Sequence, residues 1–261
     1  MDKLSVVIPA HNEQDNIEKL VTDILSELCY IRLLEVVVVD DCSTDSTKTI
    51  CLNLCKQRSK LTYIRLKKNS GQSAAVYTGV KQAKYPVIVT LDGDGQNPPK
   101  EINKLVSAYQ NTIDNQEAVL FAGHRQNRKD TWVKLISSKI ANKIRQALLR
   151  DNCPDSGCGL KLFHKNTFLM LPHFNHMHRF LPALFKRNNF QVINIPINHQ
   201  AREFGLSKYN TWGRLKVGVI DMFAVAWLAR RPCQPEVSEL VTHTENNTQH
   251  SPSTEKVTHH D

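Results

Sequence analysis

The sequence has no hydrophobic run long enough to cross a membrane. Its longest apolar stretch covers residues 217–229 and is interrupted by Asp221, whereas a spanning helix needs about 20 consecutive apolar residues. The sequence also lacks glycine-rich nucleotide motifs: no G-x-G-x-x-G follows the first predicted strand, and no P-loop is present. These absences argue against a membrane-spanning protein, a dehydrogenase and an NTP-hydrolysing motor.

Aromatic residues are scarce, at 7% of the chain. Few of them lie between the bases Arg125, Arg128, Lys129 and Lys134, so this stretch is poorly suited to stacking on nucleic-acid bases. We expect no nucleic-acid partner. The net charge is nevertheless +9, from 34 basic and 25 acidic residues. A chain this basic favours other phosphate-bearing partners, such as a nucleotide or an anionic membrane surface.

The cysteines number seven, an odd count, and no secretory signal precedes the first apolar run. We therefore expect reduced thiols in a cytoplasmic protein. Cys51 and Cys55 have no second Cys or His pair at ligand spacing nearby. Their separation of four residues fits one face of a helix better than a metal site.

Residues 1–232 alternate strand and helix patterns, whereas residues 233–261 are polar and are expected to form a disordered tail. Strands are expected at 4–8, 35–39, 61–66 and 86–91, and helices at 15–28, 44–57, 72–83, 98–110, 133–149 and 215–228. The repeated strand-helix-strand order predicts an α/β fold with a parallel sheet and helices on both faces. Ligands of such sheets bind beyond the carboxyl ends of the strands.

Polar residues follow three of the predicted strands, in residues 9–13, 40–45 and 92–96. Asp92 and Asp94 flank a glycine after a buried strand, so their like charges lie close together. A divalent cation such as Mg²⁺ or Mn²⁺ relieves that repulsion and takes one or two carboxylates plus phosphate oxygens. The alternative for this segment is an Asp-Gly hairpin turn.

The residues after the second strand have two interpretations. Asp40 can accept hydrogen bonds from a nucleoside base or ribose, while Ser43 or Thr44 can cap the next helix, with Asp45 favouring its positive end. Both can hold together. The turn that ends at Gln72 offers backbone N–H groups before a further helix.

Eight separated motifs together resemble family-2 glycosyltransferases, over roughly residues 4–232. The most similar branch contains dolichyl-phosphate mannose synthases and bacterial polyprenyl-phosphate sugar transferases. The motifs are VVIPAHNE (6–13), VVDDCSTDST (38–47), NSGQSAAV (69–76), LDGDGQNPP (91–99), GHR (123–125), DSGCGLKLF (155–163), RFLPAL (179–184) and HQAREFGLSKY (199–209). One departure is Cys42, where the family usually has glycine; a cysteine is tolerable there if the backbone is not left-handed.

The resemblance implies a nucleotide-diphospho-sugar transferase fold of the GT-A type, with a mostly parallel central sheet, and a catalytic domain over residues 1–232. It further implies metal-dependent, inverting transfer of a sugar from a donor such as GDP-mannose or a UDP-sugar to a polyprenyl phosphate at the cytoplasmic face of a membrane. The alternatives are a transferase that acts on a soluble or protein acceptor, and a catalytically inactive basic binding protein.

The matching positions assign roles to individual residues. Nucleotide-sugar binding falls to Pro9, Glu13, Asp40, Gln72 and Asp92; the Mg²⁺ or Mn²⁺ site to Asp92, Asp94 and Gln96; the acceptor phosphate to Arg125, Arg202 and Lys208; and catalysis to Asp94, Asp155, Arg125 and Arg202. Phosphate is already an anionic nucleophile near neutral pH, so we expect Asp155 to orient the acceptor rather than deprotonate it.

The expected helix at 215–228 carries an apolar stripe with basic residues near its ends. The stripe contains Val217, Ile220, Phe223, Ala224, Trp227 and Leu228, and the bases are Arg214, Lys216, Arg230 and Arg231. Such a helix suits burial in an anionic membrane surface. Packing of the stripe against the catalytic core is an equally weighted alternative, in which case a membrane-anchoring partner is needed.

Overall fold

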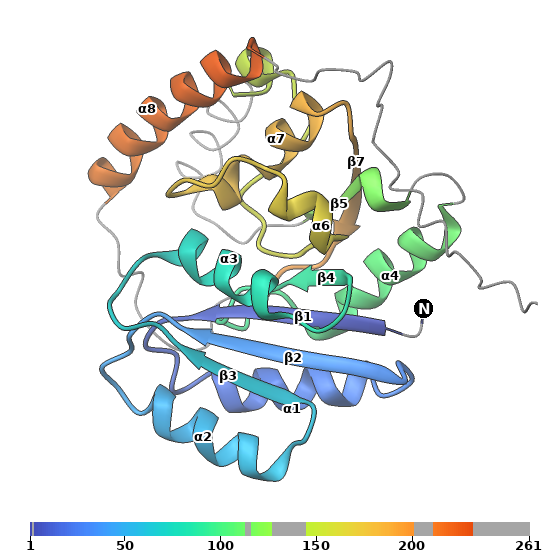
Figure 1. Ribbon diagram of the computed structural model, residues 1–261, viewed down its shortest axis with the longest axis vertical. Helices are drawn as coiled ribbons and strands as arrows, with labels where there is room; N and C mark the ends of the chain where they lie inside the picture. The colour runs from blue at the N-terminus through green and yellow to red at the C-terminus, as the bar shows by residue number, and fades with distance from the viewer. Residues whose placement is uncertain (2, 113–115, 127–144, 201–210, 232–261) are drawn as a thin grey trace, which may run out of the picture.

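A mixed seven-stranded sheet is formed by the strands of the described residues, in the order β3-β2-β1-β4-β6-β5-β7. The structure is a computed structural model that describes residues 1, 3–112, 116–126, 145–200 and 211–231, with the backbone alone at 211–217 (Figure 1). The strands are β1 (Lys3–Ala10), β2 (Leu33–Asp40), β3 (Leu61–Arg65), β4 (Val87–Thr90), β5 (Val119–Arg125), β6 (Lys161–His164) and β7 (Gln191–Ile197). All neighbouring strands are parallel except that β6 runs antiparallel to both β4 and β5. The expected mostly parallel sheet is confirmed.

Helices cover both faces of this sheet. They are α1 (Ile17–Glu27), α2 (Thr47–Gln57), α3 (Gln72–Gln82), α4 (Ile102–Asn111), α6 (Lys165–Leu169), α7 (Leu181–Arg187) and α8 (Thr211–Ala229), with short 3₁₀ turns η1 (Pro99–Glu101), η2 (Gln116–Ala118) and η3 (Met177–Arg179). Buried residues of α1, α2 and α4 pack in one apolar cluster. Those of α3, α6 and α7 pack in a second cluster. Figure 1 shows α2 and α3 on opposite sides of the strands.

The β-branched run of β2 shows why the sheet is buried on both faces. Val36 and Val38 belong to the cluster under α1, whereas Val37 and Val39 belong to the cluster under α3. All four side chains are fully buried. Successive side chains of a strand point to opposite faces, so a continuous apolar run serves two layers at once.

Several expected boundaries differ from the structure; helix α8, for example, begins at Thr211 rather than at residue 215. β1 continues through Pro9 to Ala10, because pairing with β4 ends at Val7 opposite Thr90, and a proline that lacks an N–H is tolerated beyond that last pair. Helix α2 begins at Thr47 rather than at residue 44. Of the helix expected at 133–149, only residues 145–149 are described, and they are helical. The tail at 233–261 lies outside the described residues.

Helix α3 sits close to β1 and β2 because residue 79 is a glycine. A Cβ at Gly79 would press on the Val7 side chain, closer than Cβ atoms come to their neighbours, and would lie 3.0 Å from Cγ2 of Val39. We expect Gly79→Ala to lower the free energy of unfolding by about 1–3 kcal/mol, because the buried valines have no room to move. Urea denaturation measures the change.

Gly218 in α8 provides the matched control, because a Cβ there would meet nothing within 4 Å. Gly218→Ala is expected to be neutral or stabilising by up to about 1 kcal/mol through helix propensity. Equal effects of the two substitutions would contradict the packing of α3 described here.

Candidate active site at the carboxyl edge of the sheet

The loops after β1, β2 and β4 meet at one edge of the sheet, as the sequence predicts. The N–H of Asn12 donates to Oγ of Ser43 at 2.9 Å, and the N–H of Glu13 donates to Oγ1 of Thr47 at 2.9 Å. After β4, the chain passes so near β1 that a Cβ at Gly93 would lie 3.0 Å from the carbonyl oxygen of Pro9. Residues 9–13, 40–47 and 91–96 therefore form one continuous site.

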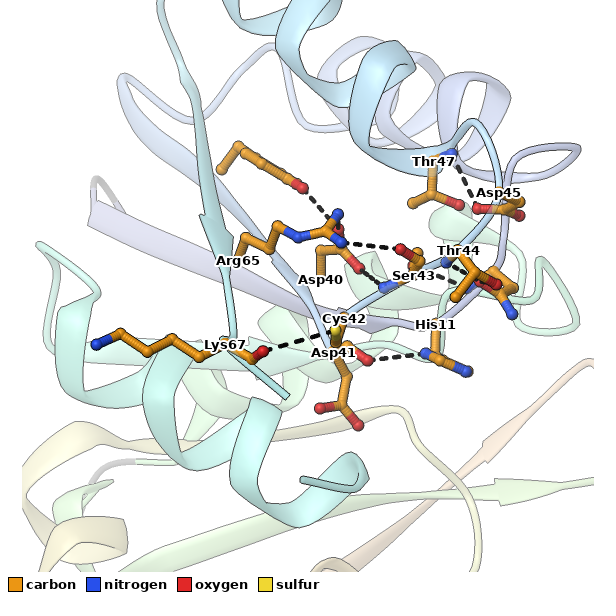
Figure 2. Close-up of polar contacts among 12 residues, drawn as sticks. His11, Asp40, Asp41, Cys42, Ser43, Thr44, Asp45, Thr47, Arg65 and Lys67 are labelled. Atoms are coloured by element: carbon orange, nitrogen blue, oxygen red, sulfur yellow. Dashed lines mark hydrogen bonds and ion pairs between the residues drawn. The ribbon is translucent and has the colours of Figure 1, made fainter. Parts of the chain in front are cut away.

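Asp40 is buried at the end of β2 and hydrogen-bonds to the loop that follows the strand, residues 41–46. Its side chain is fully buried; Oδ1 accepts the N–H of Ser43 at 2.7 Å, and Oδ2 accepts Tyr63 Oη–H at 2.6 Å and Nη1 of Arg65 at 2.9 Å (Figure 2). This differs from the expected nucleoside-facing carboxylate, because the chain itself encloses both oxygens. Burial, followed by the hydrogen bond to Asp40, raises the pKa of Tyr63. Sequence reasoning missed Tyr63 and Arg65, which lie within the strand expected at residues 61–66.

Asp41 ties the turn before α3 to β2. Its Oδ1 accepts the N–H of Ser70 and its Oδ2 the N–H of Gly71, both at 2.7 Å, while its carbonyl oxygen contacts Nδ1 of His11 at 2.8 Å (Figure 2). The sequence indicated only that the turn ending at Gln72 offers backbone N–H groups. In the structure, two of them are bound by this carboxylate, whose residue is only 4% exposed.

Of the three residues expected at the start of α2, only Asp45 bonds to the first turn of the helix. Oδ1 of Asp45 accepts the N–H of Thr47 at 3.0 Å, and the residue at the N-cap position is Ser46. Ser43 bonds instead to the β1 loop through its hydroxyl oxygen. The N–H of Thr44 likewise donates to Oδ1 of Asn12, at 2.7 Å. Contacts between loops therefore replace capping by Ser43 or Thr44.

Cys42 adopts the left-handed backbone conformation, with φ of 59°. The condition under which a cysteine is tolerable at this family glycine is therefore not met. A residue with a Cβ is conformationally strained in this region, and glycine is not. Within the described part of the chain, the thiol makes one long contact, 3.8 Å from Sγ to the carbonyl oxygen of Lys67 (Figure 2).

Asp92 lies in a confined polar environment at the end of β4. Its Oδ1 accepts Nε2 of Gln72 at 2.7 Å, and residue 159 must be glycine because a Cβ there would overlap the Asp92 carboxylate. Burial raises the pKa of Asp92 to about 6, and the neighbouring charge of Asp94 adds to the rise, while Lys161 and Arg125 oppose it. Lys161 is itself 3% exposed and donates to the carbonyl oxygen of Cys158.

Asp94 faces a wider space than Asp92. It borders a cavity of about 330 Å³, together with Asp15, Lys100 and Gln200, and its Oδ1 accepts the N–H of Gln96 at 3.2 Å. Among the described residues, no group of three His, Cys, Asp or Glu side chains could hold a metal. Two carboxylates fit an ion of the Mg²⁺ class, which takes one or two of them and completes its shell with substrate phosphates and water. Such an ion would relieve the repulsion that raises the pKa of Asp92.

Arg125, the last residue of β5, forms a two-pronged ion pair with Asp155. Nε of Arg125 lies 2.6 Å from Oδ2 of Asp155, and its Nη2 lies 2.7 Å from Oδ1. Burial lowers the pKa of Arg125 and the bond to Asp155 raises it, with a net rise. The structure thus joins two residues that the sequence assigned to the acceptor side, Arg125 to its phosphate and Asp155 to its orientation. Arg202 and Lys208 lie outside the described residues.

The chain that leads towards Arg202 is fixed against the loop of residues 91–96 that follows β4. The N–H of Gln200 donates to the carbonyl oxygen of Gln96 at 2.9 Å. The carboxylate of Glu101, which is 1% exposed, accepts the N–H of Asn198 at 3.2 Å and its Nδ2 at 3.0 Å. Sequence reasoning missed Glu101 and Lys161, although a charged residue inside an apolar strand, as in residues 160–163, is a usable signal.

Helix α8 exposes most of the apolar stripe described above. Ile220 is 68% exposed, and Phe223 and Trp227 are each 59% exposed, and Ala224 is also exposed. The opposite face packs through Val225 and Ala226 against Leu149, Phe180 and Ala183, and Leu228 contacts the α7 side of the core. The side chains of Arg214, Lys216 and Val217 are outside the description. In the part of the chain described, no helix is long and apolar enough to cross a membrane.

The sheet order and the acidic edge define a GT-A type nucleotide-sugar transferase fold. The chain belongs to glycosyl transferase family 2, whose family model matches residues 5–169. It is 34% identical over 211 residues to undecaprenyl-phosphate 4-deoxy-4-formamido-L-arabinose transferase of Enterobacter sp. (strain 638), covering 80% of this chain and 63% of that protein. It is 31% identical over 238 residues to dodecaprenyl-phosphate galacturonate synthase of Rhizobium johnstonii, covering 89% of this chain and 69% of that protein.

Solved structures share the fold. Glucosyl-3-phosphoglycerate synthase from Mycobacterium tuberculosis, solved with Mn²⁺, UDP and glucosyl-3-phosphoglycerate, matches with a TM-score of 0.64 and 16% identity, over 87% of this chain and 80% of that chain. Mannosyl-3-phosphoglycerate synthase from Rubrobacter xylanophilus matches with a TM-score of 0.65 and 12% identity, over 91% of this chain and 78% of that chain. These likenesses confirm the expected fold class.

The strained backbone at Cys42 generates a stability prediction. A left-handed conformation costs about 1–2 kcal/mol for a residue with a Cβ. Glycine avoids this strain, but it loses more conformational entropy on folding, which offsets about 0.5–1 kcal/mol of the gain. Cys42→Gly is therefore expected to raise the free energy of unfolding by about 0.5–1 kcal/mol in urea denaturation. Cys42→Ala keeps the strain and should give no gain; a gain from alanine as large as that from glycine would show that the thiol, not the backbone, is unfavourable.

Proposed function

We propose that this protein transfers a sugar from a nucleotide-diphosphate sugar to a polyprenyl phosphate. The observation that carries the proposal is the acidic pair Asp92 and Asp94, set within the same edge of the sheet as the Arg125–Asp155 ion pair. The names of both relatives support a polyprenyl-phosphate acceptor. Their sugars differ, so the donor sugar of this chain stays open, with GDP-mannose and UDP-sugars as candidates.

The nucleoside end of the donor lies, in this proposal, above the loops that carry Pro9, Glu13 and Asp40. Asp40 acts there through the groups it holds, because its own oxygens are occupied by Ser43, Tyr63 and Arg65. The guanidinium of Arg65 also donates from Nη2 to the Ser43 carbonyl at 2.9 Å. The loop is therefore set before the donor arrives, which lowers the entropy cost of binding.

Asp92 and Asp94, helped by Gln96, hold the divalent cation in this proposal. When bound, Mg²⁺ or Mn²⁺ supplies positive charge where the leaving diphosphate becomes more negative. The chain's own contribution is the placement of the two carboxylates. Gln72 and Gly159 confine Asp92, and the N–H of Gln96 holds Asp94.

The acceptor phosphate is assigned to Arg125, with Arg202 and Lys208 added by resemblance. Asp155 keeps the Arg125 guanidinium in one orientation through two short bonds. A phosphate oxygen is anionic near neutral pH, so it attacks the anomeric carbon without a general base, and an in-line attack inverts the configuration. Asp155 is thus an orienting carboxylate.

A lipid acceptor requires the enzyme to reach a membrane surface, and α8 offers the means. Ile220, Phe223 and Trp227 project from the body as an exposed apolar face, and Arg231 lies 5.2 Å from the Trp227 ring centre. Apolar burial beside basic residues favours anionic headgroups. We place the protein at the cytoplasmic face of a membrane, bound at the periphery.

The transfer itself is the first test. Purified protein, polyprenyl phosphate in detergent and labelled UDP-sugars or GDP-mannose should give label in the organic phase, abolished by chelator and restored by Mn²⁺ or Mg²⁺. Asp94→Ala should lower the rate by about 100-fold or more, because it removes a metal ligand. Asp15→Ala, in the same cavity, should stay active. Full activity of folded Asp94→Ala in chelator, or label found only in a water-soluble product, would contradict the proposal.

Membrane binding is tested by cosedimentation with vesicles. The protein should bind vesicles that contain phosphatidylglycerol and not pure phosphatidylcholine, and high salt should release much of it, because a shorter Debye length screens exposed bases. Trp227→Glu should weaken binding without unfolding the protein. Leu52→Glu is the matched control, since Leu52 is 42% exposed on α2, far from α8 in Figure 1. Equal loss in both variants, or no binding at low salt, would rule out α8 as the contact.

A further inference from the structure

Gln72 uses its amide group on a carboxylate of the proposed metal site. It is the first residue of α3, and its Nε2 donates to Oδ1 of Asp92 at 2.7 Å. A donor of this kind to a charged carboxylate stabilises one side-chain orientation more strongly than a bond between neutral groups does. The sequence assigned Gln72 to the donor, whereas the structure shows its amide nitrogen bonded to Asp92.

The backbone on both sides of Gln72 is fixed. Before it, Asp41 accepts the N–H groups of Ser70 and Gly71, both at 2.7 Å. After it, Oγ of Ser73 lies 2.7 Å from Nδ1 of His178 and accepts the His178 N–H at 3.3 Å. Ser73 is 6% exposed. The Gln72 side chain therefore starts from a backbone position that the hydrogen bonds of Asp41 and Ser73 define on its two sides.

The space beside this contact is too small for a substrate group. Gln72, Asp92, Lys161 and His178 line a cavity of about 10 Å³. That is close to the volume which holds a single water molecule. A sugar ring or a phosphate does not fit there. On this side of Asp92, the surrounding polar groups act on the carboxylate.

The contact makes the two oxygens of Asp92 unequal. Oδ1 is engaged by Gln72, and no hydrogen-bond donor from the described residues reaches Oδ2. A Cβ at residue 159 would overlap the Asp92 carboxylate, so the glycine at this position leaves the carboxylate its space. The orientation of Asp92 thus depends on one amide group at the start of α3.

We propose that Gln72 is a positioning residue for the divalent cation. It holds Oδ1 of Asp92 and leaves Oδ2 as the oxygen that the cation takes. This inference rests on the metal site of the proposed function. Gln72 then affects the affinity for the metal ion and does not itself bind the donor.

The test measures Mn²⁺ binding to the full chain by electron paramagnetic resonance, with Mn²⁺ alone and with Mn²⁺ plus UDP. Gln72→Met keeps the length of the side chain and removes the donor, and Gln72→Asn keeps the amide one methylene short of Asp92. Both should weaken Mn²⁺ binding by about 10-fold or more, the effect of losing a hydrogen bond to a charged group. Gln82→Met, at the exposed last residue of the same helix, should bind Mn²⁺ as the wild type does.

Two further readouts separate positioning from a structural or a donor-binding role. The Gln72 variants should unfold in one cooperative thermal transition, as Gln82→Met does, and their KM for the donor at saturating Mn²⁺ should stay within about twofold of the wild type. Unchanged Mn²⁺ affinity, or a raised donor KM at saturating Mn²⁺, would overturn the inference while the wild type still binds Mn²⁺. A wild-type protein that binds no Mn²⁺ even with UDP would instead overturn the metal site of the proposed function and this inference with it.

Discussion

The crowding of carboxylates at one edge of the sheet is the constraint on which the site depends. Asp40, Asp41, Asp92, Asp94 and Asp155 all follow strands or precede them at this edge, and the first two and the last are buried. A buried carboxylate is tolerated only when charged or hydrogen-bonding partners compensate it. The loops around the site are shaped by the need to supply those partners.

Each carboxylate meets this need differently. Asp40 takes Arg65 and Tyr63, Asp41 takes two backbone N–H groups, and Asp155 takes both prongs of Arg125. Asp92 is the least compensated of them, because burial still raises its pKa to about 6 despite Gln72 and Lys161. The place where compensation is incomplete is the place where a divalent cation is expected, beside Asp94.

The sequence was sufficient for strands β1 to β4 and for the meeting of their loops, because β-branched runs and the strand-helix alternation are local signals. It did not predict β5, β6 or β7. It was not sufficient for the partners of the carboxylates. Arg65 reaches Asp40 from 25 residues away in the chain, and only pairing of β2 with β3 brings them together. Likewise Gln72 meets Asp92 through the packing of α3 on β1. The residue types in a motif predicted the kind of chemistry at the site. Long-range packing, which the motif does not show, determines which group each carboxylate binds.

Cys42 and α8 show the same division. The motif flagged residue 42, but its φ angle of 59° depends on how the loop is tied to Asp40 and Asn12. The stripe on α8 was visible in the sequence, yet core packing and surface exposure were equally compatible with it. The cluster around Val225 and Ala226 fixes the orientation of the helix, and this leaves Phe223 and Trp227 outside.

The central claim is that Asp92 and Asp94 are the protein's ligands to a divalent cation that binds with the donor diphosphate. Anomalous diffraction from crystals grown with Mn²⁺ and UDP tests it most directly. The account predicts a single strong manganese peak within bonding distance of both carboxylates, with Gln72 still bound to Oδ1 of Asp92. A manganese peak at any other group of the protein, or a UDP diphosphate bound at this edge without metal, would contradict it.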